Sequence, residues 1–199
     1  MGNASSKSLT LDDIDAIRAN STAISRVSPE VRTSGQVIYG NKNTPTTIYG
    51  VNPEYLDIRK VSIKSGRIFT QAEINSSAKV CLIGKTVIKN VFGENFDPTG
   101  MIIRFNSIPF KIIGILAEKG QNNFGQDQDD LLIAPYTTVQ KRLLAITHVQ
   151  SIYISAVSED KSALAKTEIE TILRQKHKIK DGEDDDFEVR SQEELIKMF

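Results

Sequence analysis

The apolar positions of this chain change between helical and strand spacing several times along its length. Leu11, Ile14 and Ile17 recur at the spacing of one helix face, which predicts an amphipathic helix over residues 9–19. Thr10 is the residue expected to cap its N-terminus. The longest helix is expected over residues 161–176, and its predicted core positions are Leu164, Ile169, Ile172 and Leu173.

Runs rich in β-branched residues predict most of the strands. Residues 24–32 are expected to form a strand, although Pro29 requires an edge position or a bulge. Residues 79–83 are expected to form a buried strand, and Thr70 with Glu73 predicts a capping box that opens a short helix. Two β-hairpins are expected, which join residues 36–39 to 46–51 through Gly40 and Asn41, and residues 101–105 to 110–116 through Asn106 and Ser107.

The stretch FGQDQDDLLIAPYTTVQKRL, which begins at Phe124, combines a polar loop with a strand and a helix. Residues 125–130 predict an acidic, amide-rich loop. Residues 131–134 predict an apolar strand that Pro135 closes. A helix is expected to follow, with Thr137 as its N-cap.

The carboxyl end continues the mixture of strands and helices. Residues 149–157 predict a strand, and residues 182–186 predict an acidic turn. Ser191 and Glu194 have the spacing of a capping box and predict a final helix that extends to Phe199. Because this pattern stops within a helix, we expect the helix to continue in a longer protein of which the chain is a piece.

The two ends of the chain share a pattern of helices and strands, whereas the middle is richer in β structure. This distribution predicts an α+β fold with two lobes. Residues 9–52 and 148–199 are expected to form an α/β lobe, with residues 53–147 inserted into it as a mainly-β lobe. Residues 1–8 are expected to be a disordered leader or a cloning remnant.

Composition narrows the function classes. Lys plus Arg and Asp plus Glu number 25 each among 199 residues, so the formal net charge is zero. This balance argues against a nucleic-acid binder and against docking on anionic lipid by charge alone. No apolar run is long enough to span a membrane, and no signal peptide follows Met1. These features fit either a cytosolic protein or a soluble piece of a larger one.

Gly84, Lys85 and Thr86 follow an expected strand and precede an expected helix over residues 85–92, which is the setting of a phosphate-binding loop. The complete motif requires a glycine five positions before Gly84, but Lys79 occupies that position. The sequence therefore favours an ordinary strand-to-helix turn.

Two acidic clusters have the composition of candidate metal-binding loops. The first contains Asp127, Asp129 and Asp130, and the second covers residues 183–186. Counted from Asp127, the sixth and twelfth positions of an EF-hand loop hold leucine and threonine instead of glycine and glutamate. We expect solvated turns at both clusters, with a weak calcium contact as the alternative, and we predict no metal or cofactor site in this domain.

The remaining reactive residues give no positive indication of an enzyme. His148 and His177 have no second His or Cys at the spacing of metal ligands. Cys81, the single cysteine, lies in an apolar strand, where a thiol behaves as a small hydrophobe. Since no G-x-S-x-G nucleophile elbow is present, we predict no catalytic residues.

Several segments together resemble the MacB family of ABC transporters. They are TTIYGVNPEYLDIR, GRIFT, AKVCLIGKTV, the stretch from Phe124, and HKIKDGEDDDFEVRSQEE, in the same order as in that family. The similarity runs from about Leu9 to the end. The chain is therefore similar to the periplasmic core domain of a MacB-like permease subunit.

The resemblance implies a porter-like lobe built from both chain ends and an inserted, mainly-β lobe called sabre. It implies the periplasmic portion of a Gram-negative inner-membrane protein that forms a homodimer, with its ATPase in a separate cytoplasmic domain. It also implies partners, namely a periplasmic adaptor and, through it, a TolC-type outer-membrane channel. Without the membrane helices, we expect this chain to be a monomer.

The same resemblance, with the polarity of the loop, makes a docking or hinge surface the candidate site. Its residues are Gln126, Asp127, Gln128, Asp129 and Asp130. For the function of the domain, the alternatives to a MacB-like permease are a related lipoprotein-releasing permease, an extracytoplasmic ligand-sensing domain, and a soluble hydrolase that uses the acidic loop.

Overall fold

The computed structural model describes residues 9–199, and in it the chain divides into two compact units. Unit 1 consists of residues 9–30, Glu54–Lys60 and Thr147–Phe199, and unit 2 consists of Val31–Pro53 and Val61–Ile146. The leader expected over residues 1–8 lies outside the described part of the chain. Each unit is built from segments that are distant in the sequence.

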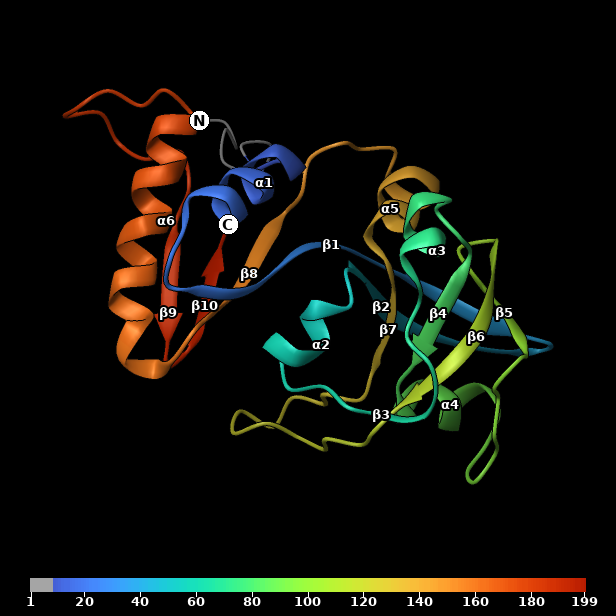
Figure 1. Ribbon diagram of the computed structural model, residues 1–199. Helices are drawn as coiled ribbons and strands as arrows, with labels where there is room; N and C mark the ends of the chain where they lie inside the picture. The colour runs from blue at the N-terminus through green and yellow to red at the C-terminus, as the bar shows by residue number, and fades with distance from the viewer. Residues whose placement is uncertain (1–8) are drawn as a thin grey trace. The chain divides into compact units, whose positions relative to one another are not determined.

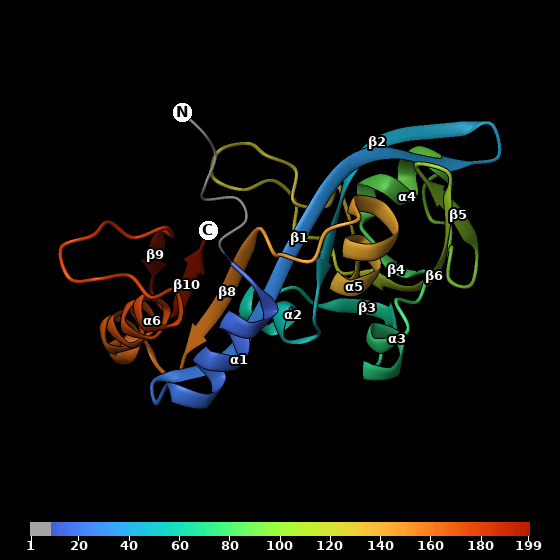
Figure 2. The ribbon, with the colours of Figure 1, turned by 90° about the horizontal axis from the view of Figure 1, so that it is seen from above.

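Unit 1 is an antiparallel sheet with two helices on one face (Figures 1 and 2). The strand order is β1-β8-β10-β9, where β1 contributes only its first half. Pro29 lies in that half, and its position on an edge strand matches the prediction. The elements are α1 (Leu11–Asn20), β1 (Ile24–Tyr39), α2 (Glu54–Ile58), β8 (Ser151–Ala156), the 3-10 turn η3 (Glu159–Lys161), α6 (Ser162–Lys176), β9 (Val189–Gln192) and β10 (Leu195–Met198).

The two long helices of unit 1 follow the predicted pattern closely. Thr10 caps α1: its hydroxyl accepts Asp13 N–H, and its own N–H donates to the Asp13 carboxylate, which completes a capping box. In α6 the prediction was wrong at one position, because Leu164 is 46% exposed and Ala165 is fully buried. Ala165 precedes Ile169 by four residues and so lies on the same helix face, whereas Leu164 is turned away from it.

The predicted terminal helix is wrong, because residues 189–198 form a β-hairpin. Ser191 lies in β9 and cannot cap a helix there. Glu193, with a φ of 55°, stands in the two-residue turn before β10. Ile196 and Met198 are buried, which is the alternation of a strand with one buried face. Pairing of β10 with β8 therefore overrides the local capping signal.

Unit 2 is a closed barrel of six strands of mixed direction (Figure 1). The cycle runs β1-β2-β7-β4-β6-β5 and returns to β1, with β2–β7 and β4–β6 parallel. A seventh strand, β3, pairs with the end of β6. The elements are β2 (Lys42–Val51), β3 (Ile63–Gly66), α3 (Gln71–Asn75), β4 (Val80–Ile83), α4 (Lys85–Val91), β5 (Ile102–Phe105), β6 (Ile108–Leu116), β7 (Leu131–Pro135), α5 (Tyr136–Thr138) and the π-helix η2 (Val139–Leu144).

Both predicted hairpins of unit 2 are confirmed. Tyr39 pairs with Lys42 across Gly40 and Asn41. Asn106 and Ser107 both have positive φ, as a tight turn between twisted strands requires. The strand β3 was not predicted, because its four residues carry one isoleucine and no alternation.

The helix after β7 begins earlier than predicted. Its N-cap is Pro135, with φ −59°, and the helix starts at Tyr136. Thr137 is therefore inside the helix and is not a cap. Its hydroxyl donates to the carbonyl of Ile74, and the hydroxyl of Thr138 donates to Ala78 at 2.7 Å. These bonds join α5 to the end of α3 and to the residues before β4.

The hairpin over residues 31–53 was expected with the chain ends, but the structure assigns it to unit 2. The reason is pairing, because β2 forms a parallel ladder with β7 and the second half of β1 pairs with β5. Conversely, residues 54–60 belong to unit 1. Tyr55 on α2 packs edge-on against Tyr153 of β8, with ring centroids 5.3 Å apart.

Candidate docking loop

Residues 117–130 connect β6 to β7, and we refer to them as the β6–β7 loop. The loop extends away from the barrel of unit 2 (Figure 1). It contains all five residues of the predicted docking or hinge surface. Backbone bonds join its two sides, including Gln128 N–H to Gly120 O at 3.0 Å and a bridge between Gln121 and Asp127. The loop is therefore a tied hairpin rather than an open coil.

Asp129 fixes the base of the loop. Its side chain is buried, with the residue only 6% exposed. One carboxylate oxygen accepts Lys119 N–H at 2.7 Å and the other accepts Gly120 N–H at 2.8 Å. Charge-assisted bonds of this kind compensate for burial of the carboxylate. Asp129 therefore holds the two sides of the loop together, and both of its carboxylate oxygens face the backbone of the loop.

The two neighbouring aspartates attach the loop to the rest of unit 2. The hydroxyl of Thr86, on α4, donates to Asp127 at 2.6 Å, and the other oxygen of Asp127 accepts Asp129 N–H at 2.8 Å. The hydroxyl of Thr46, on β2, donates to Asp130 at 2.8 Å. The carboxylates of this first acidic cluster thus bond to hydroxyl and amide groups of their own unit.

The segment considered as a phosphate loop packs directly on the β6–β7 loop. A Cβ on Gly84 would lie 2.1 Å from the carbonyl oxygen of Asp129, so no larger residue fits without a backbone shift. Lys85 forms an ion pair with Glu118 at 2.9 Å. Hydrogen bonding to Glu118 raises the pKa of Lys85. The structure therefore brings together the Gly84–Thr86 segment and the β6–β7 loop, which pack against each other.

The tip of the loop is a turn organised by Asn122. Its side-chain oxygen accepts Phe124 N–H at 2.9 Å and Gln126 N–H at 3.0 Å. Gly125 has a φ of 76°, which favours glycine at that position. Phe124 is 88% exposed. The turn therefore presents an aromatic ring and the exposed Gln126 on a preordered backbone.

The five predicted residues thus differ in their exposure to solvent. Gln126 and Asp127 are exposed, Gln128 is half-buried, Asp129 is buried, and Asp130 is exposed. The contribution of Phe124 to this surface was not predicted. The sequence NNFG could have indicated an exposed aromatic residue in a turn, because turn-forming residues surround the single phenylalanine.

Other candidate chemistry lies elsewhere. Burial raises the pKa of the Cys81 thiol well above its ordinary value, which keeps it protonated and unreactive. His177 lies in unit 1 between two aspartates. Across residues 9–199, no group of three or more His, Cys, Asp and Glu side chains is arranged to hold a metal ion. In the same residues, no helix is both long and apolar enough to cross a bilayer.

Comparison with known proteins identifies one family. The MacB-like periplasmic core domain family matches residues 1–172. A macrolide export ATP-binding/permease protein MacB from Chlorobium phaeobacteroides is 36% identical over 189 residues, which cover 95% of this chain and 28% of that protein. The MacB of Syntrophobacter fumaroxidans is 29% identical over 251 residues, covering 98% and 35%. The chain thus spans about a third of the length of these relatives.

Solved structures show the same fold. The periplasmic region of MacB from Actinobacillus actinomycetemcomitans superposes with a TM-score of 0.75 at 23% identity, covering 96% of this chain and 79% of that one. The extracellular domain of the noncanonic ABC-type transporter YknZ from Gram-positive bacteria superposes with a TM-score of 0.73 at 21% identity, covering 87% and 86%.

Proposed function

This chain belongs to the family of MacB-like periplasmic core domains, and from that membership we propose that it is the extracytoplasmic domain of an ABC-type efflux permease. In this proposal the domain does not catalyse a reaction. A separate cytoplasmic domain of the whole protein hydrolyses ATP, and this domain converts the resulting movement into a conformational change outside the membrane. The whole protein works as a homodimer. The compounds that it exports are macrolides, the class that appears in the names of its relatives.

We assign the porter-like role to unit 1, which contains both chain ends, and the sabre-like role to unit 2. The discontinuous composition of the units supports this assignment. The proposed location is the periplasmic side of a Gram-negative inner membrane. Structural similarity to a Gram-positive extracellular domain makes the outer face of a single membrane the alternative location.

The proposed partner of this domain is a periplasmic adaptor, which in turn connects to a TolC-type channel. The observation that carries the docking role is the preordered tip of the β6–β7 loop. Phe124 is exposed there on a backbone fixed by Asn122. A rigid loop loses little conformational entropy when it binds, and aromatic residues are enriched at the centres of interfaces. We place docking at Phe124 and Gln126, with Asp127 and Gln128 beside them and with Asp129 and Asp130 as supports.

The test measures binding of the 199-residue chain to the purified adaptor of the same organism by biolayer interferometry. Phe124→Ser with Gln126→Ala is expected to weaken binding at least about tenfold, as loss of an interface anchor does. Ile102→Ser is the matched control, because Ile102 lies in the same unit and is 59% exposed. Equal affinities for the wild type and the tip variant would refute docking through this loop. Failure of the wild-type chain to bind any adaptor would instead refute the partner assignment.

A further inference from the structure

A second exposed aromatic residue of unit 2, Phe96, lies beyond the end of α4 that is remote from the β6–β7 loop. It belongs to residues 92–101, which connect α4 to β5 and which we refer to as the α4–β5 loop. The ring of Phe96 lies parallel to that of Phe92, at an interplanar angle of 2° and with centroids 5.3 Å apart. Phe92 packs against Tyr39 of β1, with centroids 4.3 Å apart. The orientation of the Phe96 ring is therefore set by an aromatic stack, while the residue remains 44% exposed.

Hydrogen bonds hold the backbone of the α4–β5 loop in place. Gly100 N–H donates to the carbonyl of Ile112, on β6, at 2.7 Å. Met101 N–H donates to the carbonyl of Pro98 at 2.9 Å, and Pro98 is buried. The loop is therefore ordered before a partner binds, and Phe96 loses little conformational entropy on binding.

The exposed face of α4 joins the two loops. Lys85 and Lys89 stand four residues apart and so lie on the same face of the helix. Lys85 pairs with Glu118 of the β6–β7 loop at 2.9 Å, and Lys89 pairs with Glu94 of the α4–β5 loop at 3.3 Å. All four side chains are more than half exposed. The two loops and this helix face therefore form one continuous surface on the lower side of unit 2 in Figure 1, which we call the α4 surface.

The chemistry of the α4 surface fits a protein partner. It has an exposed aromatic residue at each end, Phe124 and Phe96, and charged pairs between them, and protein interfaces combine aromatic anchors with a polar rim. Both lysines of α4 are paired with glutamates, so the surface has no surplus of positive charge for nucleic acid or anionic lipid. A helix of seven residues is about 10 Å long. One partner can therefore cover both loops, since a stable interface buries about 800 Å² on each side.

We propose, on the basis of the adaptor docking proposed above, that Phe96 is a second anchor and that one adaptor molecule contacts both ends of the α4 surface. The adaptor then presents two apolar recesses, each bordered by polar groups, into which the two rings insert. The two anchors differ in their preparation for binding. The ring of Phe96 is already oriented by Phe92, whereas Phe124 is 88% exposed on its turn.

The first test measures binding of the 199-residue chain to the purified adaptor of the same organism by biolayer interferometry. Phe96→Ser is expected to weaken binding at least about tenfold, as loss of an interface anchor does. Added to Phe124→Ser, it is expected to weaken binding about tenfold further, because changes at separate sites add in free energy. Leu164→Ser is the matched control, because Leu164, on α6 of unit 1, is 46% exposed. This control is expected to bind like the wild type.

A second measurement leaves both rings in place. Thr99→Cys and Asn123→Cys each introduce an exposed thiol near one anchor for an environment-sensitive maleimide dye. Cys81 is the single native cysteine and is fully buried, so only the introduced thiol is labelled. Both dyes are expected to respond at the same adaptor concentration and at one adaptor per chain. A dye on Leu164→Cys is expected to give no response.

The outcomes separate this proposal from the docking proposal on which it rests. If Phe124→Ser weakens binding and Phe96→Ser does not, the second anchor is refuted and docking through the β6–β7 loop stands. If only Phe96→Ser weakens binding, the two-anchor surface is refuted because Phe124 is not an anchor. Failure of the wild type to bind refutes the partner and, with it, the occupant of the α4 surface. Should Phe96→Ser fail to fold, a silent dye at Thr99→Cys, beside a responding dye at Asn123→Cys, refutes the second anchor.

Discussion

At the scale of single residues, the β6–β7 loop owes its order to carboxylates that bond inward. Asp129 satisfies two backbone N–H groups, and Asp127 satisfies a backbone N–H and the Thr86 hydroxyl. Loop backbone that water cannot reach needs such partners. The sequence suggested that these carboxylates could bind a metal or a docking partner. In the structure, most of their hydrogen bonds instead stabilise the conformation of the loop.

Replacing Asp129 with asparagine is expected to destabilise unit 2 by about 2 kcal/mol. The amide retains one acceptor oxygen, so either Lys119 N–H or Gly120 N–H loses its bond and faces an NH₂ group instead. The measurement is urea unfolding of the purified chain.

Asp130→Asn is the matched control, because Asp130 is exposed and its remaining oxygen still accepts from Thr46. Its expected effect is within about 0.5 kcal/mol. Equal stabilities for the two variants would contradict a structural role for Asp129.

At the scale of elements, several local cap and turn signals were reliable, whereas the capping signal at Ser191 failed because strand pairing competes there. The caps at Thr10 and Thr70 and the turns at Gly40 and Asn106 all formed as predicted. Each depends on atoms within a few residues. The signal at Ser191 was of the same kind, but the exposed edge of β8 supplied backbone partners that the sequence around Ser191 does not reveal.

Non-local packing also explains what could not be foreseen in the candidate site. That Thr86 bonds to Asp127 follows from the parallel β4–β6 ladder and the antiparallel β4–β7 ladder, which set α4 beside the loop. Neither register can be read from the composition of the strands. The location of the loop was predictable from its turn residues, whereas the inward direction of its carboxylates was not.

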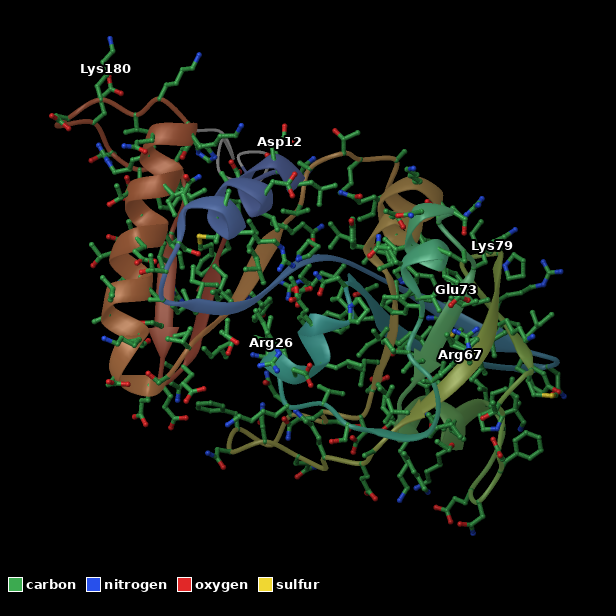
Figure 3. All side chains as sticks on the ribbon, viewed as in Figure 1. Asp12, Arg26, Arg67, Glu73, Lys79 and Lys180 are labelled. Atoms are coloured by element: carbon green, nitrogen blue, oxygen red, sulfur yellow. The ribbon has the colours of Figure 1, made fainter. Side chains whose placement is uncertain are left out.

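The capping box of α3 provides a prediction about pH. Hydrogen bonding to Arg67 lowers the pKa of Glu73, and burial opposes this only partly. Arg67 and Glu73 meet at 2.7 Å, and both are labelled in Figure 3. A group with a depressed folded pKa stabilises the fold above its unfolded value, and this contribution is lost as the pH falls through the folded value.

Glu73→Gln is therefore expected to flatten the acid limb of the stability curve below about pH 4.5. Thermal unfolding at a series of pH values measures this effect. The variant should also be less stable than the wild type at neutral pH, where the Arg67 pair is intact. A variant whose acid limb superposes on that of the wild type would show that Glu73 is not a contributor.

At the scale of the whole molecule, β1 is one continuous strand that serves two sheets. Its first half pairs with β8 and its second half with β2 and β5. The open sheet of unit 1 has edges at β1 and β9, whereas the six barrel strands of unit 2 close on each other. Each unit buries its own apolar core, so damage to one core should be detectable separately from damage to the other.

Ile196→Ala tests this separation. Ile196 is fully buried in β10, and its truncation is expected to cost about 3 kcal/mol through lost transfer energy and a residual cavity. Because β10 pairs only with β8 and β9 among the strands of residues 9–199, exchange protection should fall throughout the sheet of unit 1, including β8. Protection in β4 and β6 of the barrel should stay at its wild-type level.

Leu132→Ala, at a fully buried position in β7, is the reciprocal variant. It should lower exchange protection in the barrel of unit 2 and leave protection in the sheet of unit 1 at its wild-type level. Equal loss of protection in both units from either variant would show that the chain unfolds as one cooperative body.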